Sequence, residues 1–267
     1  MVVLVLGSAM FQLYRAIRFT ILFALFGSSP AAFSQINPGS IRKELGSERL
    51  SSRGTCAWWS DFLGFRKHFA AYEAAATPVP RLVEAANGVV LEIGPGSGNQ
   101  FSRFDKAVVS RIYGIEPNEH LFNQLRNETI EQHHLSDIYV PINAALEDKN
   151  ILKEWNIGDE SIDSVVCMQA LCSVSDPTMA VKQIYRLLKP GGQFLFWEHT
   201  ASQDWMTRQV QGIWNLLWKP LIGNCHLRRN IERAVVEAGD WKIIELGHDN
   251  IEPWQMMPRV WGRFVKV

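Results

Sequence analysis

Short apolar runs alternate with amphipathic stretches along most of the chain. A short apolar run bounded by turn residues is typical of a buried strand, whereas apolar residues three and four positions apart are typical of a helix. This pattern predicts strands over residues 89–93, 111–115, 138–142, 164–168, 193–198, 241–247 and 259–267. It predicts helices over residues 58–76, 119–132, 177–188, 205–218 and 229–238. Because strands and helices alternate from residue 89 onward, we expect an α/β fold around a mostly parallel sheet.

Prolines and glycines mark where two of these helices end. Pro78 and Pro80 break the pattern of the helix over residues 58–76, because proline disrupts a helix interior. The helix over residues 177–188 is closed by Lys189-Pro190-Gly191-Gly192. Proline cannot continue the helix there, and glycine tolerates the left-handed turn that often follows a helix end.

Residues 1–27 form an apolar segment that Arg15 and Arg18 divide into two blocks. Neither block reaches the length of about 20 residues that spans a bilayer. The segment fits an interfacial or hairpin membrane anchor with both arginines at the lipid headgroups. Two alternatives remain, namely a secretory signal cleaved at the small residues 32–34 and a helix that packs on the body of the protein.

Charge separates the N-terminal arm from the rest of the chain. Residues 28–55 are rich in Ser, Gly and charge and predict a flexible linker, so residues 56–267 are expected to be one folded domain. The 27 basic residues balance 27 acidic ones, which argues against a general nucleic-acid binder. Residues 1–57, however, carry six basic and two acidic residues. We therefore expect this arm to lie on an anionic cytosolic membrane surface.

A glycine loop, Gly94-Pro95-Gly96-Ser97-Gly98-Asn99, follows the strand predicted at residues 89–93. Glycines without Cβ let the backbone approach a ligand closely. A dinucleotide fingerprint places its third glycine where this chain has Asn99, and Pro95 removes an amide that a pyrophosphate would use. An ordinary tight turn is the alternative. Residues 94–99 thus predict a nucleotide-binding loop, called the cradle below, for a cofactor other than a dinucleotide.

Polar residues follow the next predicted strands. The second strand ends in Glu116-Pro117-Asn118, and a carboxylate at that point can accept both hydroxyl protons of a ribose. The adenine would lie beside residues 143–147, where we single out Ala144 and Ala145. After the fourth strand comes Gln169-Ala170, which offers no anionic ligand for magnesium.

The four cysteines, Cys56, Cys167, Cys172 and Cys225, include no Cys-x-x-Cys pair and no zinc-type spacing. Free cysteine is among the most buried residue types. We therefore expect small buried thiols in a reducing compartment, and a site without metal.

The order Glu92-x-Gly94-x-Gly96-x-Gly98, then Glu116, then Leu187-Leu188-Lys189-Pro190-Gly191-Gly192, resembles the class I S-adenosylmethionine-dependent methyltransferases over roughly residues 85–200. The resemblance implies a Rossmann-like fold, a mostly parallel seven-stranded sheet with an antiparallel last strand, and S-adenosylmethionine as cofactor. The residues expected to bind it are Glu92, Gly94, Gly96, Gly98, Asn99, Glu116, Pro117, Asn118, Ala144, Ala145, Gln169 and Ala170.

Finer motifs resemble the membrane-anchored thiol S-methyltransferases of the methyltransferase-like group. They are Leu171-Cys172-Ser173-Val174, Glu198-His199, a Trp-rich helix, and the segments 223–229 and 258–262. That family begins with a hydrophobic anchor and is placed on endoplasmic reticulum or lipid droplets, which implies a membrane-associated protein with its catalytic domain in the cytosol.

This chain departs from that pattern at three places. It has Pro95 where the family has Cys, Glu116 where it has Asp, and Asn224 within a reduced Gly-Asp-Gly-Cys tract. Glutamate can replace aspartate in a ribose contact. The resemblance therefore leaves the acceptor open, with a thiol placed ahead of a hydroxyl or carboxyl group of a lipid-like molecule or secondary metabolite.

Methyl transfer needs the acceptor held in line with an already activated methyl group. A thiol is partly ionised at neutral pH, whereas an alcohol requires a general base. His199 is the first candidate base, and Asp204 and His226 are weaker ones; structural, surface and capping roles are the alternatives. The apolar stripe of the helix over residues 205–218 forms core, an acceptor pocket or a membrane contact. A nicotinamide-dependent reductase and a cofactor-binding protein without methyl transfer are the rival functions.

Overall fold

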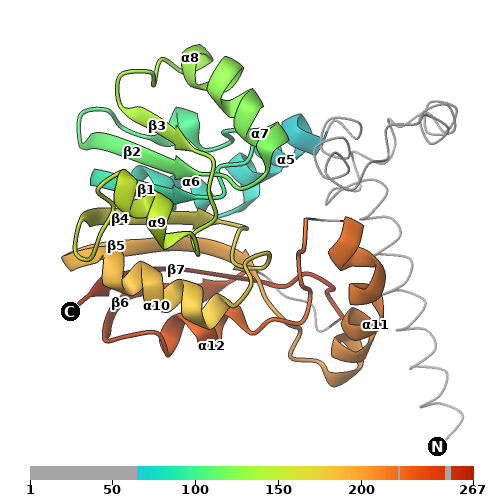
Figure 1. Cartoon of the computed structure of the whole chain (residues 1–267). Coiled ribbons are helices and arrows are strands. Elements are labelled where there is room, and N and C mark those ends of the chain that lie inside the picture. Colours follow the sequence, from blue (N-terminus) through green and yellow to red (C-terminus); the bar gives the residue numbers. More distant parts are fainter. Residues whose placement is uncertain (1–64, 222, 250–253) are drawn as a thin grey trace, which may run out of the picture.

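The computed structural model describes residues 65–221, 223–249 and 254–267. The predicted anchor, its alternatives, the linker and Cys56 lie outside these residues. Within them, no helix combines the length and the apolar character that crossing a bilayer requires. The described part is a single seven-stranded sheet with helices against both faces (Figure 1).

The strands confirm the predicted positions to within a few residues. Their bounds are β1 Gly88–Ile93, β2 Val109–Ile115, β3 Tyr139–Ile142, β4 Ile162–Met168, β5 Leu188–His199, β6 Trp241–His248 and β7 Arg259–Lys266. In the sheet they follow the order β3-β2-β1-β4-β5-β7-β6. The first five pair in parallel, whereas β7 pairs antiparallel with both β5 and β6. The expected mostly parallel sheet with an antiparallel last strand is therefore confirmed.

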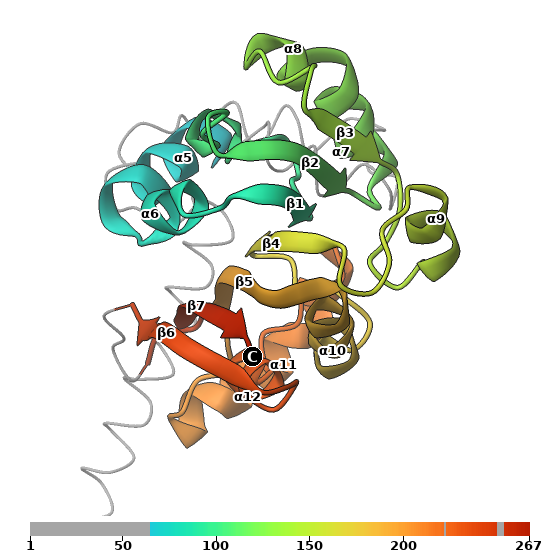
Figure 2. The same cartoon turned by 90° about the vertical axis from the view of Figure 1, so that its left-hand side faces the viewer.

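Helices cover the two faces of the sheet, and α11 packs in an apolar cluster of its own. Their bounds are α5 Phe65–Ala76, α6 Val79–Glu84, η1 Phe101–Arg103, α7 Glu119–Gln124, η2 Leu125–Thr129, α8 Ile130–Gln132, α9 Lys149–Glu154, α10 Pro177–Leu187, α11 Trp205–Leu221 and α12 Ile231–Val236. Figure 2 shows α5 and α6 on one side of the sheet and α9 and α10 on the other. Each group packs on its own apolar cluster, with Val90 and Leu82 in one cluster and Leu91 and Ile184 in the other.

Local sequence explains how helices α7 and α10 begin. Asn118 accepts hydrogen bonds from the backbone N–H groups of His120 and Leu121, which caps α7. Asp176 caps α10 in the same way, and Pro177 occupies its first turn, where a missing N–H costs nothing. The predicted helix over residues 119–132 is one helical stretch in which the π-helical segment η2 separates α7 from α8.

The helix predicted to end before Pro78 and Pro80 does end at Ala76, and the short helix α6, which was not predicted, begins at Val79 with a proline in its first turn, which helices accept. The predicted turn of residues 189–192 does end α10, but it lies inside β5. The strand pairs Leu188 with Ile162 and Gln193 with Ser164, so these turn residues bulge out of the ladder.

Candidate functional site

The glycine loop leaves β1 at the carboxyl edge of the parallel strands, where ligands bind in open α/β sheets. Gly94, Gly96 and Gly98 all have positive φ, between 57° and 85°. A Cβ on Gly94 would lie 2.8 Å from the Cβ of Ala170, and one on Gly98 would lie 2.8 Å from Thr129 Cγ2. A Cβ on Gly96 would meet no atom within 4 Å. Gly94 and Gly98 are therefore required by packing, whereas Gly96 presents bare backbone to open space.

Glu116 connects the end of β2 to this loop. Its Oε2 accepts a hydrogen bond from the Gly96 N–H at 3.0 Å, and its Oε1 accepts one from the Asn118 N–H at 2.8 Å. Burial raises the pKa of the carboxyl, and the two backbone hydrogen bonds oppose that rise. Asn143 Nδ2 donates to the Glu116 carbonyl oxygen at 2.8 Å, a contact that the sequence did not single out. The structure thus brings together the two features that predict the cofactor site.

Glu92 lies buried on β1 beside the loop. Its Oε2 accepts a hydrogen bond from the Tyr139 hydroxyl at 2.7 Å, while its Oε1 has no partner among the described residues. Tyr139 reaches it from β3 across Gly114 of β2, where any Cβ would collide with the tyrosine oxygen. Burial raises the pKa of Glu92 to about 7, and the Glu116 carboxylate adds to the rise. A buried carboxylate oxygen without a partner fits a cationic ligand.

The loop after β4 is held by Glu198, a fully buried residue of β5. Glu198 Oε1 accepts hydrogen bonds from the backbone N–H groups of Ala170 at 2.7 Å and Leu171 at 2.9 Å, and from the Cys167 thiol at 3.3 Å. Gln169 adopts a φ of 66°, and its N–H donates to the Trp197 carbonyl. These contacts fix the loop against Gly94, which places both predicted residues of the loop beside the cradle.

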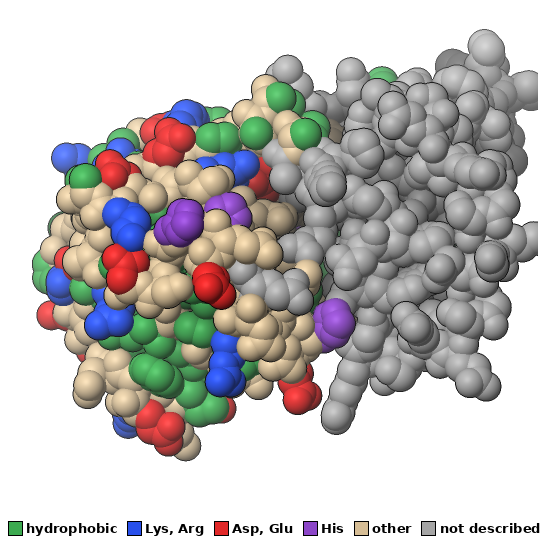
Figure 3. Space-filling view, turned by 90° about the horizontal axis from the view of Figure 1, so that it is seen from above, with side chains coloured by type: hydrophobic (Ala, Val, Ile, Leu, Met, Phe, Trp, Pro, Cys, Tyr) green, Lys and Arg blue, Asp and Glu red, His purple; other side chains and the backbone are tan. Residues whose placement is uncertain are grey.

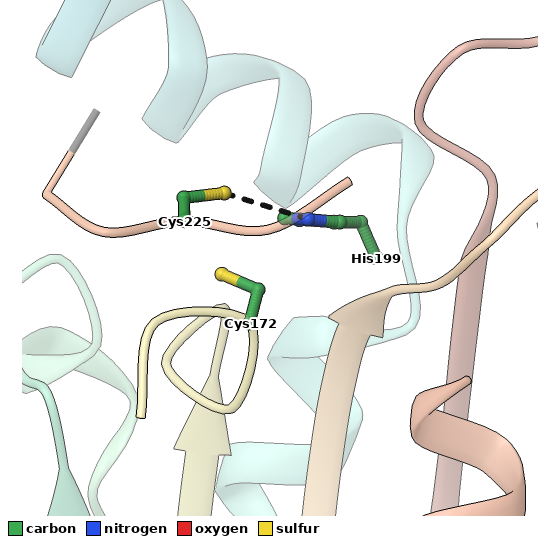
Figure 4. A group of neighbouring side chains, drawn as sticks. All are labelled: Cys172, His199 and Cys225. Atoms are coloured by element: carbon green, nitrogen blue, oxygen red, sulfur yellow. Dashed lines mark hydrogen bonds between the residues drawn. The ribbon is translucent and has the colours of Figure 1, made fainter. Parts of the chain in front are cut away.

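His199 ends β5 and is almost completely buried. Its Nε2 lies 3.2 Å from the His226 carbonyl oxygen and 3.5 Å from Cys225 Sγ. Cys172, from the loop after β4, points toward the same place (Figure 4). One ligand atom from each of Cys172, His199 and Cys225 lies within 4.8 Å of the other two. The expected burial is confirmed for the three described thiols, Cys167, Cys172 and Cys225, but the meeting of Cys172 and Cys225 with His199 was not predicted.

The remaining candidates lie at the edge of this group. The Asp204 carboxylate accepts a hydrogen bond from the Thr207 N–H at 2.7 Å in the first turn of α11, so it acts as a helix cap. The His226 backbone N–H donates to the Cys172 carbonyl, while burial and the charges of Arg229 and Lys219 lower the pKa of its ring. His226 therefore contacts His199 through its backbone carbonyl rather than its ring, and Asp204 has a structural contact.

The other predicted cofactor residues differ in exposure. Asn99 Oδ1 faces the Ser97 hydroxyl at 3.4 Å, directly within the loop. Pro117 is exposed after Glu116. Ala144 is buried and Ala145 half-buried in the segment that follows β3.

Comparison with known proteins places this site in a family. The family model described as a methyltransferase domain matches residues 66–244, which is more than half of the chain. The chain is a methyltransferase. It belongs to the S-adenosylmethionine-dependent class, because the cradle, the carboxylate after β2 and the sheet order all agree with that membership.

Named relatives and solved structures agree with this assignment. Thiol S-methyltransferase TMT1B of Homo sapiens is 32% identical over 182 residues, which cover 66% of this chain and 70% of that protein. Geranyl diphosphate methyltransferase, solved with GPP and sinefungin, matches with a TM-score of 0.56 and 9% identity over 83% of this chain and 85% of its own. The [4+2]-cyclase SpnF matches with a TM-score of 0.55 and 14% identity over 81% and 97%. The two structural matches show the fold alone.

Replacing Glu92 by glutamine should remove a pH dependence from the stability of the methyltransferase. The folded state raises the pKa of Glu92 from 4.5 to about 7, so this residue stabilises the fold fully below about pH 4.5 and loses that contribution as pH rises through 7. The loss is about 3 kcal/mol from the relation between pKa and free energy. Denaturant unfolding measures the free energy of unfolding of both proteins from about pH 5 to about pH 8. Over this range the wild type should lose about this amount relative to Glu92→Gln. Parallel pH profiles would contradict the assignment.

Proposed function

We propose that this methyltransferase transfers the methyl group of S-adenosylmethionine to the sulfur of a small hydrophobic thiol. The observation that carries the proposal is the hydrogen bond between the open Gly96 backbone and the Glu116 carboxylate. The neighbouring loop after β4 continues into Cys172, which is buried beside His199 and Cys225. The relatives named thiol S-methyltransferase support the choice of sulfur, at 31% and 32% identity.

The residues of the cradle fit S-adenosylmethionine. Gly96 lets the backbone come close to the cofactor, and Glu116 would hold its ribose hydroxyls. The unpartnered Oε1 of Glu92 would face its positive charge. Gln169, Ala170 and Ala144 would flank the adenosyl group. When bound, S-adenosylmethionine supplies a methyl group activated on a sulfonium, so the protein has to align the acceptor rather than activate the donor.

A sulfur acceptor agrees with the surroundings of His199. The imidazole is buried against the His226 carbonyl and the Cys225 thiol, and the Asp204 carboxylate is occupied as a cap. A hydroxyl acceptor would need a general base to take its proton, whereas a thiol needs far less help. This arrangement therefore suits a thiol better than an alcohol or a phenol.

The outer face of α11 supports an acceptor of low polarity and contact with a membrane. Trp205, Ile213 and Leu216 are 69%, 68% and 77% exposed and lie on one stripe of the helix. The inner face is core, because Val210 and Trp218 pack in a separate apolar cluster. By contrast, the face of the molecule shown in Figure 3 carries interspersed basic and acidic side chains. We propose that residues 1–27 anchor the protein and that α11 lies toward the lipid.

The proposal is tested with the full chain and matched acceptors. Calorimetry should show binding of S-adenosylmethionine and none of NADPH. A thiol should yield S-adenosylhomocysteine and the thioether, whereas the alcohol or phenol of the same carbon skeleton should yield at least about 100-fold less, since it lacks base assistance. Methylation of the oxygen compounds alone would overturn the choice of sulfur. Binding of the cofactor without turnover of any acceptor would favour a member of the fold that does not methylate.

A further inference from the structure

Two thiols and one imidazole from separate segments meet in the interior of the protein. Cys172 comes from the loop after β4, His199 from the end of β5, and Cys225 from the segment after α11. Their side chains are buried, with 3%, 1% and 5% of their surface exposed. Figure 4 shows the three side chains converging on one point from three directions. Their proximity is therefore set by the tertiary fold.

The spacing of these atoms matches a metal site. Tetrahedral zinc has bonds of about 2.3 Å to sulfur and about 2.0 Å to nitrogen, which separates a sulfur from a nitrogen ligand by about 3.5 Å and two sulfur ligands by about 3.8 Å. Cys225 Sγ lies 3.5 Å from His199 Nε2, and all three ligand atoms fall within 4.8 Å of one another. Thiolate and imidazole are the ligands that select zinc over magnesium or calcium. We propose that Cys172, His199 and Cys225 bind a zinc ion.

Neighbouring groups form hydrogen bonds that orient these ligands, as the groups around the ligands of a metal site usually do. The Trp218 indole N–H donates to Cys225 Sγ at 3.2 Å, a contact that stabilises negative charge on sulfur. The Arg229 guanidinium donates to the Cys172 carbonyl at 2.8 Å and so fixes the loop that carries this ligand. His199 Nε2 gives up its contact with the His226 carbonyl when it takes the metal, which places the ring proton on Nδ1.

The site has three protein ligands, which is the number found in catalytic zinc sites with an open fourth position. Cys172 is two residues from Ala170, and Ala170 abuts Gly94 of the cofactor cradle. One loop thus carries both a metal ligand and a contact of the cofactor cradle, and the proposal places the fourth position on the side of the cradle. This step rests on the proposed function, since it assigns the fourth position to the sulfur of the acceptor thiol.

The reaction at such a site balances without a change of oxidation state. The acceptor thiol binds zinc as a thiolate and releases its proton to solvent. Its sulfur forms a bond to the methyl carbon while the bond between that carbon and the sulfonium breaks, which yields a thioether and S-adenosylhomocysteine. The neutral thioether is a poor zinc ligand and leaves. The expectation of a metal-free site would then be wrong for the acceptor side.

The test is a cobalt titration of the full chain, stripped of metal and kept reduced. Cobalt should bind once per chain, with thiolate-to-cobalt charge-transfer absorption and the strong visible bands of tetrahedral cobalt, and zinc should displace it. Cys172→Ser and Cys225→Ser should abolish the charge-transfer band. Trp218→Phe should weaken zinc binding by about 10-fold, because it removes an outer contact. Cys167→Ser is the matched control, since Cys167 is equally buried but donates to Glu198 and should leave the titration unchanged.

Binding of S-adenosylmethionine within about twofold of the wild type would show that each variant is folded and that its cradle is intact. A reduced protein that binds neither cobalt nor zinc, or a Cys172–Cys225 disulfide with no metal binding after reduction, would overturn the zinc site and leave the proposed function standing. Metal binding by a protein that methylates no thiol would overturn the proposed function and leave the metal site standing. Thiol methylation that rises with zinc occupancy supports both.

Discussion

Replacing Glu116 by alanine should weaken the binding of S-adenosylmethionine by about 10- to 100-fold, the cost of losing two charge-assisted hydrogen bonds. The Glu116 Oε2 accepts the Gly96 N–H of the glycine loop at 3.0 Å, and Oε1 accepts the Asn118 N–H at 2.8 Å. The variant loses the proposed acceptor for the ribose hydroxyls and also the hydrogen bond to the Gly96 N–H. Calorimetry of both proteins under the same conditions measures the change directly.

Two further variants separate the carboxylate from general effects of charge. Glu119 is exposed on α7, three residues away, and Glu119→Ala should leave the affinity within about twofold. Glu116→Gln keeps one acceptor oxygen but removes the negative charge, so its affinity should fall between those of the wild type and Glu116→Ala. Equal affinities for wild type and Glu116→Ala would remove Glu116 from the cofactor site.

The meeting of the glycine loop with Glu116 could be predicted from the sequence because it depends on strand ends. The apolar run before Gly94 and the run before Glu116 become neighbouring parallel strands, so their carboxyl ends meet without further information. The hydrogen bond between Gly96 and Glu116 follows from this adjacency. The six-residue helices α6 and α9 are harder to predict, because so short a segment shows little helical periodicity.

The interior contacts were not predicted because they join residues far apart in the chain. Tyr139 reaches Glu92 only because Gly114 of the intervening strand has no Cβ. The meeting of Cys172 with Cys225 depends on where α11 returns the chain to the end of β5. Spacing rules for metal ligands compare close neighbours in sequence and do not detect ligands that only the tertiary fold brings together.

Replacing Glu198 by alanine should lower the free energy of unfolding by about 3 kcal/mol, because one buried and one partly buried backbone N–H group lose their acceptor. These are the N–H groups of Ala170 and Leu171, 2.7 Å and 2.9 Å from Glu198 Oε1. Denaturant unfolding measures the loss. Since the same loop abuts Gly94 and carries Cys172, the variant should also bind S-adenosylmethionine more weakly at temperatures where it remains folded.

Glu198→Gln distinguishes the hydrogen bonds from the charge of this carboxylate. Burial raises the pKa of Glu198, which means that the fold disfavours its ionised form, and glutamine retains an oxygen where Oε1 lies. The stability of Glu198→Gln should therefore stay within about 1 kcal/mol of the wild type, since its amide oxygen still accepts both N–H groups. A loss as large as that of Glu198→Ala would show that the negative charge, rather than the acceptor oxygen, positions this loop. The loop lies between the glycine loop and the cysteine and histidine side chains of the proposed metal site.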